Sequence, residues 1–157
     1  MSRFTAACLL AVLATPAAAA DRKLPYWASI AAGEARMRTG PSLTYPATWL
    51  YKRRDLPIRV IETYPSWRKV QEPDGTVGWM LVGLLSDTRT AIVPTGGPRD
   101  MRISPAPDAA VAYRVAPGAV GRVSKCGGGW CRLDVKGRAG FIRTADLWGV
   151  DPDEVLD

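Results

Sequence analysis

Short apolar segments alternate with polar ones along most of the chain, and their period is that of strands. Residues 59–62 and 67–70 carry β-branched and aromatic side chains in partial alternation, which is typical of strands with one buried face. Residues 73–75 form a turn signal, because glycine tolerates the positive φ that tight hairpins need, and residues 77–80 follow as the next strand. No stretch between residues 21 and 150 has a helical period. The pattern predicts an all-β protein.

Blocks of the first half of the chain recur in the second half in the same order. The spacing between matching residues falls from 64 to 63 to 62 along the chain. The matching pairs are Met37 and Met101, Arg59 and Arg122, Trp67 and Trp130, Gly78 and Gly140, and Leu85 and Leu147. Such ordered recurrence predicts a duplication, with one unit at residues 28–93, a second at 94–150, and an acidic C-terminal tail at 151–157. The proline- and glycine-rich segment 94–98 has the composition of a short linker.

Each unit resembles a bacterial SH3 domain (SH3b). In the first unit the resemblance rests on Met-Arg-x-Gly-Pro-Ser at residues 37–42, Trp-Arg-x-Val at 67–70, Asp-Gly-x-x-Gly-Trp at 74–79, and Leu84-Leu85. The second unit departs at Phe141, which replaces the tryptophan, and at residues 104–107, which replace Gly-Pro-Ser. The resemblance implies two small SH3-like β-barrels in tandem and a binding role at or near the cell wall, without implying a reaction. The acidic, tyrosine-rich loop of proline-binding SH3 domains is missing, so recognition of PxxP peptides is not implied.

The first twenty residues have the three parts of a secretory signal peptide. Arg3 supplies the positive charge, residues 6–14 the apolar core, and three alanines at 18–20 a cleavage site. We therefore expect cleavage near Ala20 and a periplasmic or secreted protein. No later stretch is apolar enough to predict a transmembrane span.

Charge and composition narrow the possible partners and reactions. The chain has 21 Lys and Arg against 15 Asp and Glu, a net charge of +6 that falls to +5 if the leader takes Arg3 with it. Such a charge favours anionic partners, and export argues against nucleic acid. Histidine is absent, which excludes the commonest general base and metal ligand. Glu72 and Asp74 flank a turn where they should be solvated, so we expect no catalytic residues, no metal and no cofactor.

Cys126 and Cys131 are the only cysteines beyond the leader. An even pair in an exported domain predicts a structural disulfide, with the intervening glycines 127–129 closing a hairpin. The short loop limits the stabilisation to about 2 kcal/mol. Free thiols, or a redox or metal site, are the alternatives.

The aromatic residues give the candidate binding site. Trp67, Trp79, Trp130 and Phe141 lie on predicted strands and are expected in the cores. Tyr45, Trp49 and Tyr51 lie in the long first loop beside Arg53 and Arg54, and together they predict a ligand-binding surface of rings and cations. The alternative is that these rings anchor the loop on the barrel. The matching stretch of the second unit, residues 107–117, offers only Tyr113.

These observations favour a non-catalytic binding module of the cell envelope. Its expected partner is cell-wall polymer, the peptide stems of that polymer, or an envelope protein. Two alternatives stay open: a cell-wall-associated enzyme or the accessory subunit of one, and a structural adaptor in an envelope complex.

Overall fold

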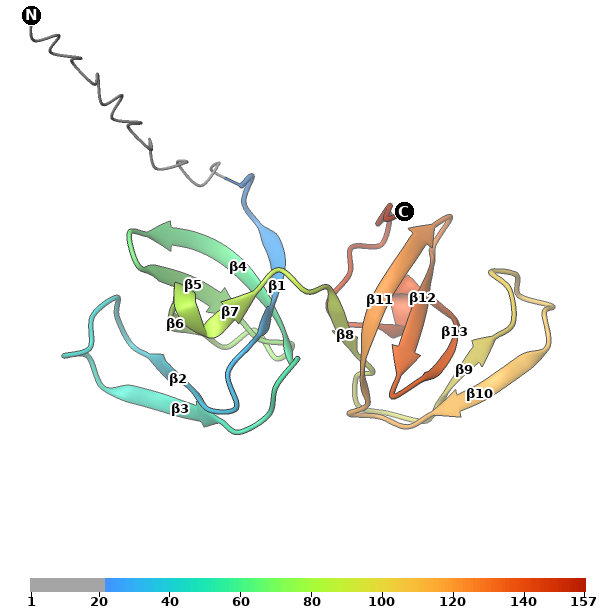
Figure 1. Cartoon of the computed structure of the whole chain (residues 1–157), viewed down its shortest axis with the longest axis horizontal. Helices are drawn as coiled ribbons and strands as arrows, with labels where there is room; N and C mark the ends of the chain where they lie inside the picture. The colour runs from blue at the N-terminus through green and yellow to red at the C-terminus, as the bar shows by residue number, and fades with distance from the viewer. Residues whose placement is uncertain (1–21) are drawn as a thin grey trace, which may run out of the picture.

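The computed structural model describes residues 22–157, so the expected signal peptide lies outside the described residues. Strands and turns make up this part of the chain, with two single-turn 3-10 helices as the only helical segments within residues 22–157. Two sheets lie side by side (Figure 1), which confirms the all-β fold and its division into two barrels. No helix within the described range is long and apolar enough to cross a membrane.

The first unit is a seven-stranded antiparallel sheet that curls on itself. Its strand order is β3-β2-β6-β5-β4-β1-β7, so the edge is β3 and the last strand, β7, pairs with β1. The predicted strands at 59–62, 67–70 and 77–80 are confirmed, and Gly75 takes a φ of +87° in the predicted turn. The elements are β1 (Tyr26–Ile30), β2 (Ala35–Arg38), β3 (Ala47–Tyr51), β4 (Pro57–Tyr64), β5 (Trp67–Gln71), β6 (Val77–Leu81), η1 (Val82–Leu84) and β7 (Leu85–Ser86).

The second unit repeats this plan in a six-stranded sheet of order β10-β9-β13-β12-β11-β8. A single bridge between Ile92 and Trp148 takes the place of the β1–β7 pairing. The elements are β8 (Thr90–Ile92), β9 (Arg99–Arg102), β10 (Val111–Val115), β11 (Val120–Gly127), β12 (Trp130–Val135), β13 (Arg138–Arg143) and η2 (Thr144–Asp146).

The backbones of the two units share a specific turn that joins the β3–β4 loop to β1 in the first unit and the β10–β11 loop to the end of β8 in the second. Asp55 and Gly118 both adopt positive φ, at +63° and +80°. Each donates its N–H over 2.8 Å to a strand carbonyl, Asp55 to Ile30 and Gly118 to Val93. Gly118 follows Asp55 by 63 residues, and Val93 follows Ile30 by the same number, which is an offset seen in the sequence. The sequence repeat is therefore also a repeat of structure.

The chain crosses from one sheet to the other earlier than the sequence suggested. β8 pairs with β11 and therefore belongs to the second unit, which places the crossing at residues 87–89 instead of 94–98. The segment 94–98 is a loop inside the second unit, between β8 and β9. Pro94 has no N–H to extend the β8 ladder, so it helps to end the strand. A proline- and glycine-rich segment after a strand has the same composition whether it is a loop within a unit or a linker between units.

Each barrel closes around its own apolar core. In the first core Met37 lies against Gly78, and in the second Met101 lies against Gly140. A Cβ at Gly78 would come within 2.7 Å of Met37 Sδ, and a Cβ at Gly140 within 2.9 Å of Met101 Cβ. The repeated glycines are therefore required because a methionine packs directly on the backbone of the neighbouring strand.

The acidic tail is attached to the second unit. Leu156 pairs with Cys126 through a backbone hydrogen bond of 3.1 Å, and the Cys126–Cys131 disulfide predicted from the sequence is present in the β11–β12 hairpin. Glu154 accepts from Arg89 at 2.8 Å and from the Asp151 N–H at 2.9 Å. The tail thus ties the end of the chain to the segment that enters β8.

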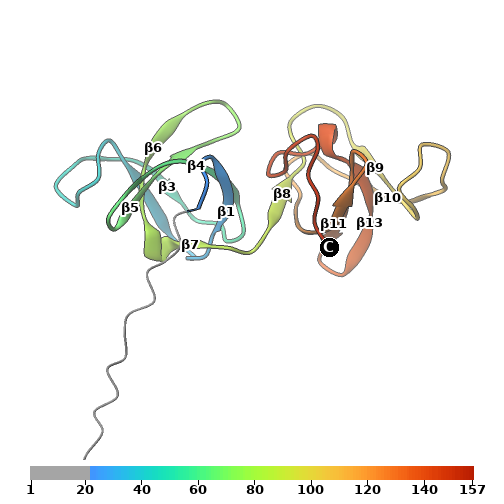
Figure 2. The ribbon, with the colours of Figure 1, turned by 90° about the horizontal axis from the view of Figure 1, so that it is seen from above.

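The two units lie side by side (Figure 2), and side chains from both meet between them. The Trp27 ring meets the Trp148 ring edge to face, with centroids 4.9 Å apart. Arg59 lies over the Trp27 ring at 5.5 Å and reaches within 4.0 Å of Asp151. Arg53 of the first unit donates to the Gly118 carbonyl of the second over 3.0 Å. These contacts fix how the two barrels face each other.

Candidate functional site

The first unit carries a groove between its 3-10 turn, the β2–β3 hairpin and the start of β5. The cavity has a volume of about 260 Å³. Four leucines and Trp67 form most of its wall, and Glu34, Arg36 and Arg38 supply the charge. We call this cavity the first groove, and its lining residues are Glu34, Arg36, Arg38, Leu43, Leu50, Trp67, Leu81 and Leu84.

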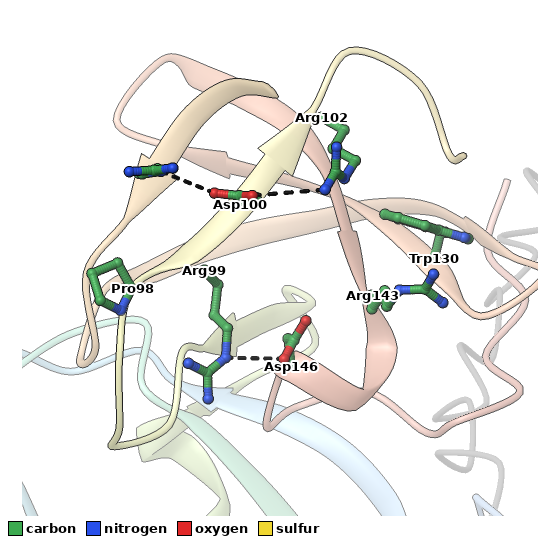
Figure 3. A pocket seen from close by; sticks show the side chains of 8 residues that line it. Pro98, Arg99, Asp100, Arg102, Trp130, Arg143 and Asp146 are labelled. Atoms are coloured by element: carbon green, nitrogen blue, oxygen red, sulfur yellow. Dashed lines mark hydrogen bonds and ion pairs between the residues drawn. The ribbon is translucent and has the colours of Figure 1, made fainter. Parts of the chain in front are cut away.

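The second unit carries a groove of about 370 Å³ that has a different chemistry (Figure 3). Four arginines and two aspartates line it together with Trp130, and the leucines of the first groove are missing from its lining. We call this cavity the second groove, and its lining residues are Pro98, Arg99, Asp100, Arg102, Arg114, Trp130, Arg143 and Asp146.

The two grooves occupy the same place in the repeated fold. Strand pairing shows this directly, because Arg36 lies opposite Leu50 in the first unit as Asp100 lies opposite Arg114 in the second. Seven of the eight residues that line each groove are equivalent. The pairs are Glu34 and Pro98, Arg36 and Asp100, Arg38 and Arg102, Leu50 and Arg114, Trp67 and Trp130, Leu81 and Arg143, and Leu84 and Asp146.

Ion pairs hold three of the four arginines of the second groove. Asp100 lies between two of them, with Oδ1 at 3.2 Å from Arg114 Nε and Oδ2 at 3.7 Å from Arg102 (Figure 3). Asp146 Oδ1 holds Arg99 Nε at 2.9 Å. With four arginines and two aspartates, the second groove has an excess of two positive charges.

One arginine in each groove braces the loop that forms its rim. Arg38 donates to the Tyr45 carbonyl at 2.7 Å and to the Leu43 carbonyl at 3.2 Å. Arg102 donates in the same way to the Ala109 carbonyl at 2.6 Å. These two arginines therefore shape the grooves, whereas Arg36 and Arg143 are exposed and available to a ligand.

The tryptophan of each groove does not offer an open ring face. Trp67 and Trp130 are each only 7% exposed. The Arg143 guanidinium covers the Trp130 ring at 4.6 Å from the ring centroid. A sugar ring binds by stacking on an exposed aromatic face, so this geometry suits an extended chain with apolar and acidic groups better than a glycan.

The profile of the bacterial SH3 domain matches the chain twice, at residues 31–87 and 97–149. The chain belongs to the bacterial SH3 domain family. The two matched ranges coincide with the two structural repeats, so the resemblance seen in the first unit extends to the second despite Phe141 and residues 104–107. No curated protein matches the sequence.

Solved structures that contain similar folds come from proteins about twice as long. NlpC1 of Trichomonas vaginalis is 12% identical, with a TM-score of 0.36, and the alignment covers 88% of this chain and 50% of that one. NlpC2 of the same organism gives 12% identity, a TM-score of 0.36, and coverage of 81% and 49%. An NlpC/P60 family protein from Bacillus cereus ATCC 10987 is 13% identical, with a TM-score of 0.35, and the alignment covers 78% of this chain and 55% of that one. This bacterial SH3 chain therefore spans about half the length of each.

The structure separates the residues predicted as one binding surface. Trp49 is 60% exposed on the edge strand β3, and Tyr45 is 46% exposed, with its ring packed over Gly40. Arg53 and Arg54 lie in the β3–β4 loop and face the second unit. Tyr45 and Trp49 are exposed, as a ligand-contacting role requires, and that role stays a prediction.

Tyr51 is wrong as a contact residue because it belongs to the first core. Its side chain is 6% exposed, and its hydroxyl lies 3.6 Å from Met37 Sδ. Burial raises the pKa of this phenol above its usual range, and the nearby Glu72 carboxylate raises it further. The sequence did not show which of these rings is buried, because the first four residues of β3 are all exposed and only the last one, Tyr51, is buried.

The aromatic residues expected in the cores are mostly buried, but at the edge of the core. Trp67, Trp79 and Trp130 are at most 9% exposed, whereas Phe141 is half-buried and that expectation is wrong. Phe141 lies opposite Arg102 and Arg132 on the outer face of β13. Met80 and Ile142, which follow Trp79 and Phe141, fill the cores instead.

Glu72 and Asp74, the acids considered for catalysis, form hydrogen bonds within the β5–β6 turn. Asp74 accepts the Thr76 N–H at 2.8 Å, and this hydrogen bond lowers the pKa of the Asp74 carboxyl. Within residues 22–157, no three acidic or cysteine side chains come together as a metal site would require.

The groove residues were not predicted from the sequence, among them Leu50 and Leu81 and their counterparts Arg114 and Arg143. The signal was available, because all four fall at matching positions of the repeat. A repeated strand position that holds leucine in one unit and arginine in the other gives the two grooves different polarity.

Proposed function

We propose that this protein is a non-catalytic binding module of the cell envelope that binds the peptide stems of the cell wall through its two grooves. The observation that carries the proposal is the recurrence, at equivalent positions of both bacterial SH3 units, of a groove that combines a buried tryptophan with exposed arginine. The protein would act after export, in the periplasm or outside the cell.

The chemistry of the grooves favours peptide over glycan. Arginine guanidinium groups hold carboxylates with paired hydrogen bonds, and the leucines of the first groove can take small aliphatic side chains. Stem peptides offer both free carboxylates and methyl groups. The ring faces of Trp67 and Trp130, in contrast, are buried or covered.

The two grooves would take different parts of such a ligand. The first groove is largely apolar and the second carries an excess of positive charge. Two weak sites on one rigid pair of barrels raise the affinity for a repeating polymer, because the second contact becomes intramolecular. This explains why a binding protein would retain two copies of one domain.

Co-sedimentation with purified cell wall tests the proposal. The two-unit protein should sediment with intact cell wall and should remain in solution with glycan strands whose peptide stems have been removed by an amidase. Equal sedimentation with stripped glycan would contradict the proposed ligand. Capture of one protein from an envelope extract, without binding to cell wall, would favour the envelope-protein alternative instead.

Charge-reversal variants locate the site. Arg36→Glu and Arg143→Glu alter one exposed residue in each groove, and together they should weaken sedimentation by about tenfold, since a charge-assisted hydrogen bond contributes about 1.5–3 kcal/mol. Lys125→Glu with Arg138→Glu reverses two exposed charges outside both grooves and is the matched control.

The exposed rings of Trp49 and Tyr45 are the second candidate surface. Trp49→Ala should leave folding unchanged because the side chain is 60% exposed. If this variant loses binding while the groove variants retain it, the site is the outer edge of β3.

The proposal includes no reaction, and this point has its own test. Soluble stem-bearing fragments incubated with the protein should keep their mass. Any cleaved product would support the alternative of a cell-wall enzyme.

A further inference from the structure

A third cavity lies between the two units, and it has no counterpart within either one. It has a volume of about 440 Å³. We call it the interdomain cleft. Its basic residues are Arg53 and Arg54 from the β3–β4 loop of the first unit, and Arg122 and Lys136 from β11 and the β12–β13 turn of the second.

We propose that the interdomain cleft binds an oxyanion, a phosphate or carboxylate group carried on a larger ligand, which the two units hold jointly. The basis is the position of four cations from both units around one cavity, together with a buried hydroxyl group in its wall. The site is distinct from the two grooves and does not depend on the ligand proposed for them.

The cations of the cleft are not neutralised by neighbouring acids. Among residues 22–157, none of these four basic side chains forms an ion pair within 4.0 Å, whereas three of the four arginines in the second groove do. Asp134 lines the cleft, but its carboxylate accepts the Gly137 N–H at 2.7 Å. Asp55 is the other acid, so the cleft keeps an excess of two positive charges.

Thr90 supplies an unused hydrogen-bonding group at the same place. It lines the cleft while being only 2% exposed, and its Oγ1 has no hydrogen-bond partner among the described residues. A buried hydroxyl without a partner is destabilising, because it has lost its hydrogen bonds to water without replacing them. Thr90 lies directly opposite Arg122 in the β8–β11 pairing, so the unpartnered hydroxyl and an exposed arginine belong to neighbouring residues in the wall of the cleft.

Contacts between the units hold the cleft in shape before any ligand arrives. Arg53 reaches the Gly118 carbonyl across the cleft. The Trp27 and Trp148 rings pack between the barrels, and a Cβ at Gly149 would come within 3.0 Å of the Pro57 side chain. A preformed site loses less entropy on binding, which favours even a small anion.

Guanidinium and ammonium groups select for oxyanions by geometry and charge. Arginine presents a planar fork of N–H donors that matches two oxygens of a phosphate or carboxylate, and lysine adds a point charge. Phosphate and carboxylate share this chemistry, and they are separated by probing with each.

The experiment uses the two-unit protein with pyrophosphate and citrate as probes, followed by NMR amide shifts and calorimetry. We expect saturable binding, with the largest shifts at Thr90, Arg122 and Lys136. Preference for pyrophosphate would assign a phosphate-bearing ligand and preference for citrate a carboxylate-bearing one. Shifts centred on Arg99 and Arg143, or absent throughout, would overturn the proposal.

Matched variants separate the cleft from overall charge. Arg122→Gln with Lys136→Gln should weaken binding at least about fivefold, a change of about 1 kcal/mol. Lys125→Gln with Arg138→Gln removes the same charge from the same hairpins outside the cleft. Lys125 in this control and Lys136 in the test variant both have positive φ, at +49° and +54°, so the two variants change similar backbone positions. This control should stay within about twofold. Equal losses in both variants would show non-specific attraction and overturn the proposal.

Thr90→Val tests the hydroxyl. Valine has the shape of threonine but lacks Oγ1, so the variant should weaken probe binding about threefold or more while its melting temperature stays equal or rises. Unchanged binding in a folded variant would show that Thr90 takes no part in binding. The cleft would then be no different from any other basic surface, and the proposal would be overturned.

Discussion

The Trp27 and Trp148 rings meet edge to face across the boundary between the two units, at a centroid distance of 4.9 Å and an interplanar angle of 88°. Trp27 is 8% exposed, and Arg59 covers its other side. Trp148 lies in the second unit at the place that Ser86 occupies in the first, since Trp148 pairs with Ile92 of β8 as Ser86 pairs with Ser29 of β1. A position that closes the barrel in one unit therefore joins the barrels in the other.

Removing the Trp148 ring should uncouple the units. Trp148→Ala keeps the backbone hydrogen bonds to Ile92, at 2.8 and 3.0 Å, but loses the aromatic contact. We expect a loss of about 2–3 kcal/mol in the free energy of unfolding, because the substitution deletes a large, partly buried ring. Denaturant unfolding measures the loss, with the exposed Trp49→Ala as control at about 0.5 kcal/mol or less. Equal effects in the two variants would show that the ring pair does not join the units.

The glycine that faces Met37 should not tolerate a side chain. Gly78→Ala would place a Cβ within 2.7 Å of Met37 Sδ and 3.0 Å of the Arg38 carbonyl, so we expect a loss of about 1–3 kcal/mol from overpacking. Gly83→Ala is the control, because a Cβ there meets nothing within 4 Å. Thermal unfolding should separate the two, and similar melting temperatures would mean that the β2–β6 packing is looser than described.

The pairing of Glu154 with Arg89 should make the stability depend on pH. Burial raises the pKa of the Glu154 carboxyl, but the hydrogen bonds from Arg89 and from the Asp151 N–H outweigh it, so the net pKa lies below the ordinary value of 4.5. A lowered folded-state pKa stabilises the fold above the unfolded pKa, and this stabilisation is lost as the pH falls through the folded pKa. The wild type should therefore lose more stability than Glu154→Gln between about pH 5 and pH 2. Unfolding curves at several pH values measure the difference, and parallel curves would contradict it.

The disulfide should stabilise the second unit alone. Cys131→Ser opens the Cys126–Cys131 link, and the short loop predicts a loss of about 2 kcal/mol. The NMR signals of the first unit should hardly change. Thiol labelling of the native wild type without reductant should modify neither cysteine, and full labelling would rule out the link.

The sequence was sufficient for the fold because the repeat and the turns are local features. The Gly75 turn, the strands around Trp67 and Trp79, and the 63-residue offset are each visible in a short window of sequence. The boundary between the units is not visible in a short window of sequence, because Pro94 and its neighbouring glycines form a loop after β8, and only the pairing of β8 with β11 shows that β8 belongs to the second unit.

The site was harder to predict because it depends on which face a strand residue takes. Tyr51 and Trp49 are two residues apart on the edge strand β3, yet Tyr51 is buried and Trp49 is exposed, so the alternation expected of a strand did not distinguish them. Arg53 and Arg54 were grouped with these rings by proximity in sequence, whereas the packing of the second unit directs them to the interdomain cleft.

An NMR titration of the two-unit protein with stem-bearing muropeptides tests the central claim most directly. The account predicts saturable shifts at the grooves, around Arg36, Leu50 and Leu81 in the first unit and around Arg114 and Arg143 in the second. The same titration with glycan fragments that lack stems should leave these amides unmoved. Shifts that follow the glycan alone, or that cluster at Trp49 and leave both grooves unchanged, would contradict it.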